Sequence, residues 1–117
     1  MNIEELTQAL MTFRDERNWA QFHTLRNLIV SLNLEASELL ELTQWKSDPE
    51  IAAMPEDDRQ MEALRDECAD VLLYLLLIAA KGGFDLLRAA AAKLEKNALK
   101  YPVEKCFGSS RKYTELG

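Results

Sequence analysis

Residues 34–45 read LEASELLELTQW, and residues 66–77 read DECADVLLYLLL. Each stretch is rich in helix-forming apolar residues and carries two acids three positions apart. Glu35 and Glu38 form the first pair, and Glu67 and Asp70 form the second. Side chains three positions apart lie on the same face of a helix. The two stretches therefore predict two long helices, each with a pair of carboxylates beside its apolar face.

The chain as a whole has the composition of a small helical domain. It has 117 residues, of which 48% are hydrophobic and 29% are charged, and this size predicts a single domain, residues 1–117. The chain contains only 4 glycines and 3 prolines, which supply few turns and favour a few long helices over many short strands.

Apolar residues at helical spacing predict four helices, so we expect an all-α fold. Asn2 is the expected N-cap of the first helix, Gly82-Gly83 ends the third, and Asp85 caps the fourth. The helices are expected at about residues 3–17, 25–45, 58–81 and 85–101. The other segments are expected to be a loop or frayed helix entry (18–27), a connection (46–58) and an irregular C-terminal tail (102–117). The predicted core stripe of the third helix is Leu64, Cys68, Val71, Leu75 and Ile78.

Charge and hydropathy argue against several classes of protein. The formal net charge is −6, and the chain has no tract rich in lysine and arginine. Such a chain is a poor candidate for binding nucleic acid polymers, whose phosphates need basic side chains. The longest apolar run, Val71 to Ala80, is ten residues, whereas about 20 are needed to span a bilayer. The N-terminus is acidic, unlike a signal peptide, and Cys68 and Cys106 lack metal-binding spacing. We therefore expect a soluble cytoplasmic protein that binds neither nucleic acid polymers nor membranes.

The four acids favour a metal site. Two carboxylates about 5 Å apart repel by roughly 3 kcal/mol at an effective dielectric constant of about 20. A partly buried group of four would become protonated or push the helices apart unless a cation lies between them. A single acid in such a pattern is usually a surface residue, but two pairs beside apolar faces are harder to explain that way. Carboxylate ligands suit Mg²⁺ or Mn²⁺, whereas a di-iron bundle needs Glu-x-x-His pairs, which the single His23 does not supply. Because Mg²⁺ often binds substrate phosphates as well, the pattern favours a phosphate-bearing substrate.

Aromatic residues lie just outside the predicted ends of the first two helices: Trp19, Phe22, His23 and Trp45. A lone tryptophan is most often part of a core, but Trp19 and Trp45 beside a metal-binding face are equally consistent with a sandwich around a flat base. The sequence leaves both interpretations open. It contains no GxxxxGK[ST] phosphate-binding loop.

Several stretches carry a family resemblance that covers nearly the whole chain from Phe13 onward. They are ERNWAQFH (16–23), RNL (26–28), QWKSD (44–48), DVLLYL (70–75), KYPV (100–103) and GSSRKYTEL (108–116). Together with the two acid pairs, they resemble the all-α nucleoside triphosphate pyrophosphatase superfamily, which includes the MazG-like proteins and the dimeric dUTPases. The similarity is strongest to the dCTP pyrophosphatase branch.

The resemblance implies a four-helix bundle, a homotetramer arranged as a dimer of dimers, and Mg²⁺-dependent hydrolysis of a dNTP to dNMP and pyrophosphate. The metal ligands that it implies are Glu35, Glu38, Glu67 and Asp70. The positions that it implies for substrate contact are Trp19, Ala20, Gln21, Phe22, His23, Trp45, Tyr74, Lys93, Asn97, Arg111 and Lys112.

The chain departs from the pattern of that branch at three positions. Leu34 and Ser37 stand where the branch often has the glycines of GEVGE, and Leu10 stands where vertebrate members carry a histidine. The preferred base is therefore less well defined by the sequence than the type of reaction.

We therefore predict a Mg²⁺-dependent nucleoside triphosphate pyrophosphohydrolase that acts on a dNTP, with dCTP as the expected substrate, and clears unwanted nucleotides. Its carboxylates act through the metal, with Mn²⁺ as a possible substitute for Mg²⁺, and Glu41 is a further candidate acid or base. An enzyme with the same chemistry on dUTP, a broad set of NTPs or phosphoribosyl-ATP is one alternative. A helical Mg²⁺-binding interaction protein without enzymatic activity is the other.

Overall fold

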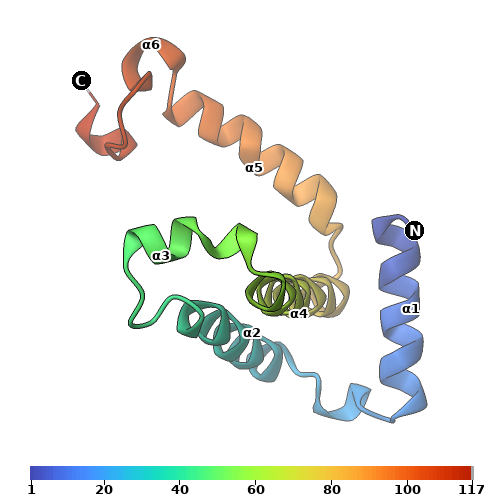
Figure 1. The fold of residues 1–117 in the computed structure, drawn as a ribbon. Coiled ribbons are helices and arrows are strands. Elements are labelled where there is room, and N and C mark those ends of the chain that lie inside the picture. Colours follow the sequence, from blue (N-terminus) through green and yellow to red (C-terminus); the bar gives the residue numbers. More distant parts are fainter. Residues whose placement is uncertain (117) are drawn as a thin grey trace. The chain divides into compact units, whose positions relative to one another are not determined.

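The computed structural model describes residues 1–116, which fold into helices and connecting turns without a strand (Figure 1). The all-α class is therefore confirmed for the described chain. A first compact unit, Met1–Gly83, contains the long helices α1 (Ile3–Glu16), α2 (Leu25–Glu41) and α4 (Asp58–Gly82). It also contains the short elements η1 (Ala20–Phe22), α3 (Asp48–Ala52) and η2 (Met54–Glu56). A second unit begins at Phe84 and contains α5 (Leu86–Lys100), α6 (Val103–Cys106) and η3 (Tyr113–Glu115).

Local capping residues fix several helix ends as predicted. The side chain of Asn2 accepts a hydrogen bond of 2.8 Å from the Glu5 N–H at the start of α1. Asp85 does the same for the Arg88 N–H at 3.0 Å at the start of α5. Gly83 follows α4 with φ of +73°, a left-handed conformation that glycine adopts without a steric penalty.

The second helix is shorter than the predicted 25–45. It ends at Glu41, and the chain turns through residues 42–45, where Trp45 has φ of +67°. The apolar repeat continues through Leu42 and Trp45, so periodicity alone did not mark the end of the helix.

The predicted connection (46–58) and the predicted irregular tail (102–117) both contain short helices. In the connection 46–58, Ser47 and Glu50 form a capping box that starts α3, a local signal that the sequence did contain. In the tail, residues 103–106 form α6, and residues 113–115 form a 3₁₀ turn.

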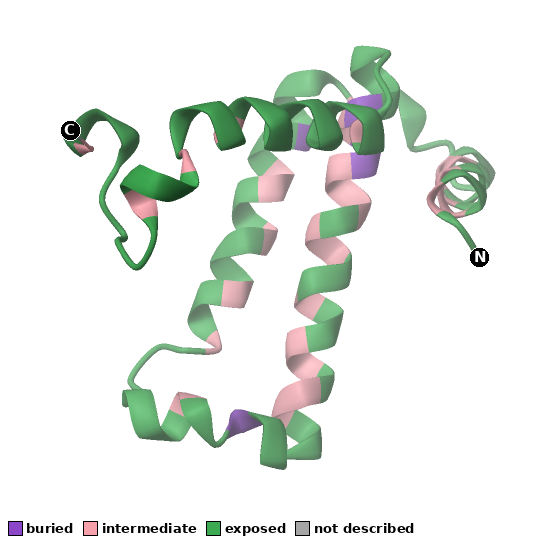
Figure 2. Cartoon of the chain, turned by 90° about the horizontal axis from the view of Figure 1, so that it is seen from above, coloured by how far each residue is buried: buried purple, intermediate pink, exposed green. Residues whose placement is uncertain are grey.

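The scaffold of the first unit is the pair α2 and α4, which run antiparallel beside each other (Figure 2). Helix α1 also contacts α4. Buried apolar residues lie at the two ends of this pair. Leu28, in the first turn of α2, is only 2% exposed, and Met54 is buried in η2 at the opposite end. The buried residues of α4 are Leu76, Leu77 and Ala79, near its C-terminus. Among residues 1–116, the middle of the pair has no fully buried side chain.

The core of α4 therefore differs from the predicted stripe. None of the five predicted residues is fully buried, and Cys68 is exposed. The cause is that only the C-terminal part of α4 is enclosed in one chain, although the apolar pattern extends along the whole helix. None of the helices described here is both long enough and apolar enough to cross a membrane.

Candidate metal centre

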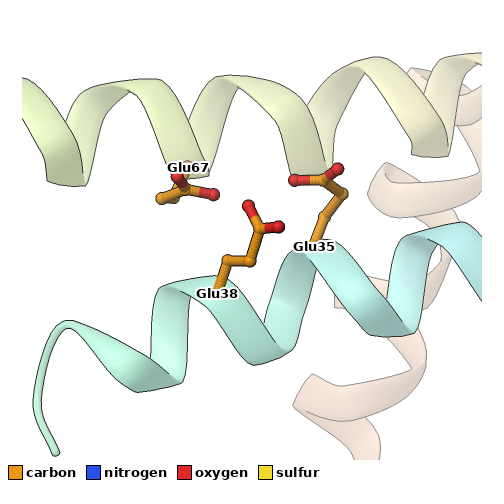
Figure 3. Close-up of side chains that lie close together, drawn as sticks. All are labelled: Glu35, Glu38 and Glu67. Atoms are coloured by element: carbon orange, nitrogen blue, oxygen red, sulfur yellow. The ribbon is translucent and has the colours of Figure 1, made fainter.

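Three carboxylates converge in the middle of the α2–α4 pair. Glu35 and Glu38 project from α2, and Glu67 projects from α4 toward them (Figure 3). One oxygen from each side chain lies within 4.8 Å of the others. Helical spacing places the two α2 acids on one face, and the antiparallel partner brings the third acid opposite them.

Asp70 lies one turn after Glu67 on α4 and is half-buried. It does not belong to the group of three oxygens within 4.8 Å, but it is close enough for its charge to raise the pKa of both Glu35 and Glu67. The structure therefore gathers three of the four predicted ligands and keeps the fourth beside them.

The electrostatics of the cluster are unfavourable without a cation. Burial raises the pKa of Glu35 above its usual 4.5, and the charges of Glu38 and Asp70 raise it further. Burial also raises the pKa of Glu67, and the adjacent Glu38 carboxyl adds to the effect, followed by Glu35 and Asp70. In both cases the protein disfavours the charged form.

Two oxygens of the cluster are buried and lack a partner. Within residues 1–116, neither Oε2 of Glu35 nor Oε2 of Glu67 has a hydrogen-bond donor. Buried polar atoms are normally paired, so an unpaired acceptor calls for an explanation such as an ion. A set of three carboxylates without histidine or cysteine suits a hard divalent cation. The residues present therefore fit a divalent metal ion.

Glu41 lies apart from this cluster. It lines a shallow hollow of about 380 Å³ at the C-terminal end of α2, and it is not among the three converging carboxylates. The other residues that line the hollow are Ser37, Leu40, Thr43 and Gln44. The structure thus separates Glu41 from the three converging carboxylates, and its role as an acid or base remains a prediction. Tyr74, half-buried, lies two turns after Glu67 on the same face of α4.

The predicted aromatic residues fall into two groups. Trp19 precedes η1, which consists of Ala20, Gln21 and Phe22, and His23 follows it. Trp19 is 44% exposed, whereas Trp45, beyond the other end of α2, is 92% exposed. The 17 residues of α2 make a helix about 25 Å long, so one chain does not place the two tryptophans around a single base. The remaining predicted contacts lie in the second unit: Lys93 and Asn97 on α5, and Arg111 and Lys112 before η3.

Two residues that were not predicted as part of the site lie next to Trp19: Phe13 contacts Trp19, and Arg17 contacts Phe13. The rings of Phe13 and Trp19 lie 5.7 Å apart, and the Arg17 guanidinium lies 3.7 Å from the centre of the Phe13 ring. The signal for this arrangement is Asn18, because asparagine is one of the few residues that readily takes the left-handed conformation after a helix.

The chain is similar to several known proteins. It is 42% identical over 114 residues to dCTP pyrophosphatase 1 of Rattus norvegicus, an alignment that covers 97% of this chain and 67% of that protein. The identity to the protein of the same name from Homo sapiens is also 42%, with the same coverage. A crystal structure of a pyrophosphatase from Archaeoglobus fulgidus superposes with a TM-score of 0.77 at 41% identity, covering 86% of this chain and 92% of that one.

A family match covers most of the chain, including all four of the paired acids. Residues 30–116 match the family described as MazG-like. This match spans three quarters of the sequence (87 of 117 residues). The alignments with the two dCTP pyrophosphatases cover 97% of this chain. We conclude that this chain belongs to the MazG-like family.

Proposed function

We propose that this protein is a Mg²⁺-dependent nucleoside triphosphate pyrophosphohydrolase that converts dCTP to dCMP and pyrophosphate. The observation that carries the proposal is the convergence of Glu35, Glu38 and Glu67 within 4.8 Å in a chain 42% identical to dCTP pyrophosphatase 1. A role in clearing unwanted nucleotides follows from this activity.

In this proposal the carboxylates of α2 and α4 hold Mg²⁺, with Asp70 as a fourth ligand. Mg²⁺ held there would neutralise charge on the phosphates and would make the attacking water more acidic. The two helices fix the directions of the side chains, so the acids need little rearrangement to bind the ion. A carboxylate oxygen of the cluster that does not bind the metal accepts the proton of the water that attacks the α-phosphorus. Cleavage there releases pyrophosphate.

The residues around η1 are proposed to receive the base. Trp19 offers an exposed aromatic face on which a base can stack, and Tyr74 shares its helix face with Glu67. Lys93, Asn97, Arg111 and Lys112 are proposed to contact the sugar or the phosphates, because cations and amides suit these groups.

The assembly is proposed to be a homotetramer of four-helix bundles. Large apolar side chains on α5 are exposed in one chain, including Leu87 at 63% and Leu94 at 70%. These residues are seven positions apart and share a helix face, as in helix–helix contacts. A base sandwiched by Trp19 and Trp45 also requires the Trp45 of a second copy, because one chain holds the two at opposite ends of α2.

The test is a product-resolved assay with the four standard dNTPs, dUTP, CTP and phosphoribosyl-ATP, each with Mg²⁺ or with EDTA. We expect Mg²⁺-dependent formation of dCMP and pyrophosphate from dCTP, faster than from the other nucleotides. Glu67→Gln, which removes one of the converging carboxylates, should lose this activity. Glu62→Gln is the matched control and should keep the activity, because Glu62 is an exposed glutamate on the same helix.

The outcomes separate the parts of the proposal. Faster pyrophosphate release from another nucleotide would keep the chemistry and overturn the choice of dCTP. Formation of a diphosphate and phosphate would overturn cleavage at the α-phosphorus. Absence of turnover of any nucleotide by the folded protein would leave the carboxylates as a binding site only.

A further inference from the structure

The loop that carries Trp19 is built on the C-terminus of α1. The Trp19 N–H donates to the Arg14 carbonyl at 3.0 Å, and the Asn18 N–H donates to the Asp15 carbonyl at 3.0 Å. Asn18 itself has φ of +54°. These two bonds around a left-handed residue define a Schellman motif, which reverses the chain after a helix. Trp19 is therefore placed by the backbone of the last turn of α1.

The side chains of the same turn hold the indole. A Schellman motif is often accompanied by an apolar contact between the residue after the left-handed position and the last helical turns, and here Phe13 makes this contact. The two rings meet edge to face at 75°, with centres 5.7 Å apart. An edge-to-face contact fixes a ring without covering both of its faces, which agrees with the exposed area left on Trp19.

Arg17 holds Phe13 in turn. Its guanidinium lies 3.7 Å from the centre of the Phe13 ring, and its Nη1 donates to the Phe13 carbonyl at 2.9 Å. The partner acid of Arg17, Glu16, is 3.8 Å away and exposed, so it competes weakly for the guanidinium. Arg17 is thus fixed by the residue that it covers.

Two amide side chains complete the loop. Gln21 Nε2 donates to the Asn18 carbonyl at 3.0 Å, and Asn27 Nδ2 donates to the Phe22 carbonyl at 2.9 Å. The loop between α1 and α2 is therefore braced at both ends by its own residues and by the helices that it joins.

We propose that Phe13 and Arg17 are positioning residues that hold the indole of Trp19 ready to stack on the nucleobase. This inference rests on the proposed function, since contact between Trp19 and the base is part of it. Both residues are proposed to act through Trp19. They reduce the conformational entropy that the Trp19 side chain loses on binding, because a preorganised side chain has less freedom to lose. They should therefore act on nucleotide affinity and leave the rate at saturation unchanged.

The test measures binding without hydrolysis. The dissociation constant of α,β-imido-dCTP, a dCTP analogue that resists cleavage at the α-phosphorus, is measured by calorimetry with Mg²⁺. The variants are Phe13→Leu and Arg17→Gln, and we expect the dissociation constant to rise about three- to tenfold in each. The KM for dCTP should rise in parallel, with kcat unchanged. Binding of inorganic triphosphate, which has the phosphates and no base, should stay at the wild-type value.

Matched variants separate positioning from folding. Phe13→Tyr keeps the aromatic ring and should bind the analogue with the affinity of the wild type. Asn18→Gly keeps the left-handed turn and should also keep this affinity, whereas Asn18→Val disfavours the turn and should lower it. Phe107→Leu and Arg59→Gln remove exposed side chains of the same kinds elsewhere and should bind the analogue like the wild type.

Each result decides the inference. Unchanged affinity of Phe13→Leu and Arg17→Gln for the analogue would overturn it, and so would an equal loss of affinity for inorganic triphosphate. If the wild type binds the analogue but hydrolyses no nucleotide, the proposed function fails while the affinities still decide the role of Phe13 and Arg17. If the wild type neither binds the analogue nor hydrolyses dCTP, both fail.

Discussion

Glu35 on α2 and Glu67 on α4 face the same space between the helices, and each has a buried Oε2 without a hydrogen-bond donor in the described chain. Such a pair is an electrostatic defect in the folded protein unless a proton or a cation joins it. We therefore expect the stability of the α2–α4 pair to respond to metal ions and to pH, and these responses can be measured without knowing the substrate.

Glu67→Gln should separate activity from stability. Loss of one carboxylate weakens the metal site, so we expect kcat/KM to fall by about 100-fold or more. The metal-free variant should be at least as stable as the wild type, because the substitution removes repulsion with Glu38 and Glu35. Thermal unfolding in EDTA checks this, with Glu62→Gln as the control. A clear loss of stability in EDTA would instead identify Glu67 as a structural hydrogen-bond partner.

Mg²⁺ should stabilise the wild type by mass action. At a concentration of about 100 times its dissociation constant, a ligand that binds only the folded state adds about 2.7 kcal/mol. We expect a rise in Tm on adding MgCl₂ that EDTA reverses and that is much smaller in Glu67→Gln. NaCl at equal ionic strength is the control for charge screening. An equal rise in both proteins would place the stabilising ion elsewhere.

The metal-free protein should become more stable on mild acidification. The pKa values of Glu35 and Glu67 lie above the usual 4.5 in the folded protein, so between 4.5 and these raised values the folded state binds more protons than the unfolded state. Stability therefore falls as the pH rises through this window and is gained as the pH is lowered through it. Tm in EDTA, measured from neutral pH down to 4.5, should show this gain.

The double variant Glu35→Gln/Glu67→Gln serves as the control for the pH experiment, and its Tm should depend less on pH. Two other groups have pKa shifts of the opposite sign. Burial lowers the pKa of His23 below its usual 6.5, so the effect of His23 opposes the gain at pH values just below 6.5, and the double variant keeps this effect. Hydrogen bonds from Gln60 lower the pKa of Asp57 below 3.8, so protonation of Asp57 costs stability only below the pH range of the experiment. A wild-type Tm that falls between neutral pH and 4.5 as much as the Tm of the double variant does would contradict the expected effect of the two glutamates.

Leu28 should be the most sensitive apolar position on α2, because it is the buried residue of that helix. Leu28→Ala is expected to lower the free energy of unfolding by about 2–5 kcal/mol, as measured by urea denaturation. Leu28→Met, which nearly conserves volume, should lower it by less than about 1.5 kcal/mol. Similar values for the two variants would mean that the site does not pack as the structure shows.

The exposed apolar face of α5 should hold the assembly together. Leu94→Glu is expected to shift the protein to a smaller species in sedimentation velocity, because a charge in an apolar interface loses its hydration. Glu95→Gln, on an adjacent exposed position of the same helix, should leave the sedimentation coefficient unchanged. A wild-type protein that sediments as a monomer would contradict the proposed tetramer directly.

The elements that could be predicted from the sequence are those fixed by neighbouring residues. Asn2, Gly83 and Asp85 act through backbone geometry within a few positions, so their roles were correctly predicted. The end of α2 was missed because Leu42 and Trp45 continue the apolar repeat beyond the last helical residue. The start of α3 was also missed, although Ser47 and Glu50 carry the capping signal.

In the site, too, features set by neighbouring residues could be predicted, whereas features set by helix packing could not. Helical spacing alone places Glu35 beside Glu38, but the position of Glu67 opposite them depends on how α2 and α4 pair, which local patterns do not determine. The expected core stripe around Cys68 failed for a related reason, because burial on α4 depends on which of its faces is covered by another element. The contact of Arg17 with Phe13 could not be predicted, since nothing in the spacing distinguishes a cation over a ring from a solvated arginine.

The contacts that hold Trp19 and its loop also have a consequence for the order of folding. All of these contacts join residues no more than six positions apart, between Phe13 and Asn27. Contacts between near neighbours in sequence close small loops and form quickly, whereas the meeting of Glu35 with Glu67 must close a loop of more than thirty residues. During synthesis, the segment proposed to recognise the base can therefore take shape while the helix that supplies Glu67 is still in the ribosome, and the metal centre is completed afterwards.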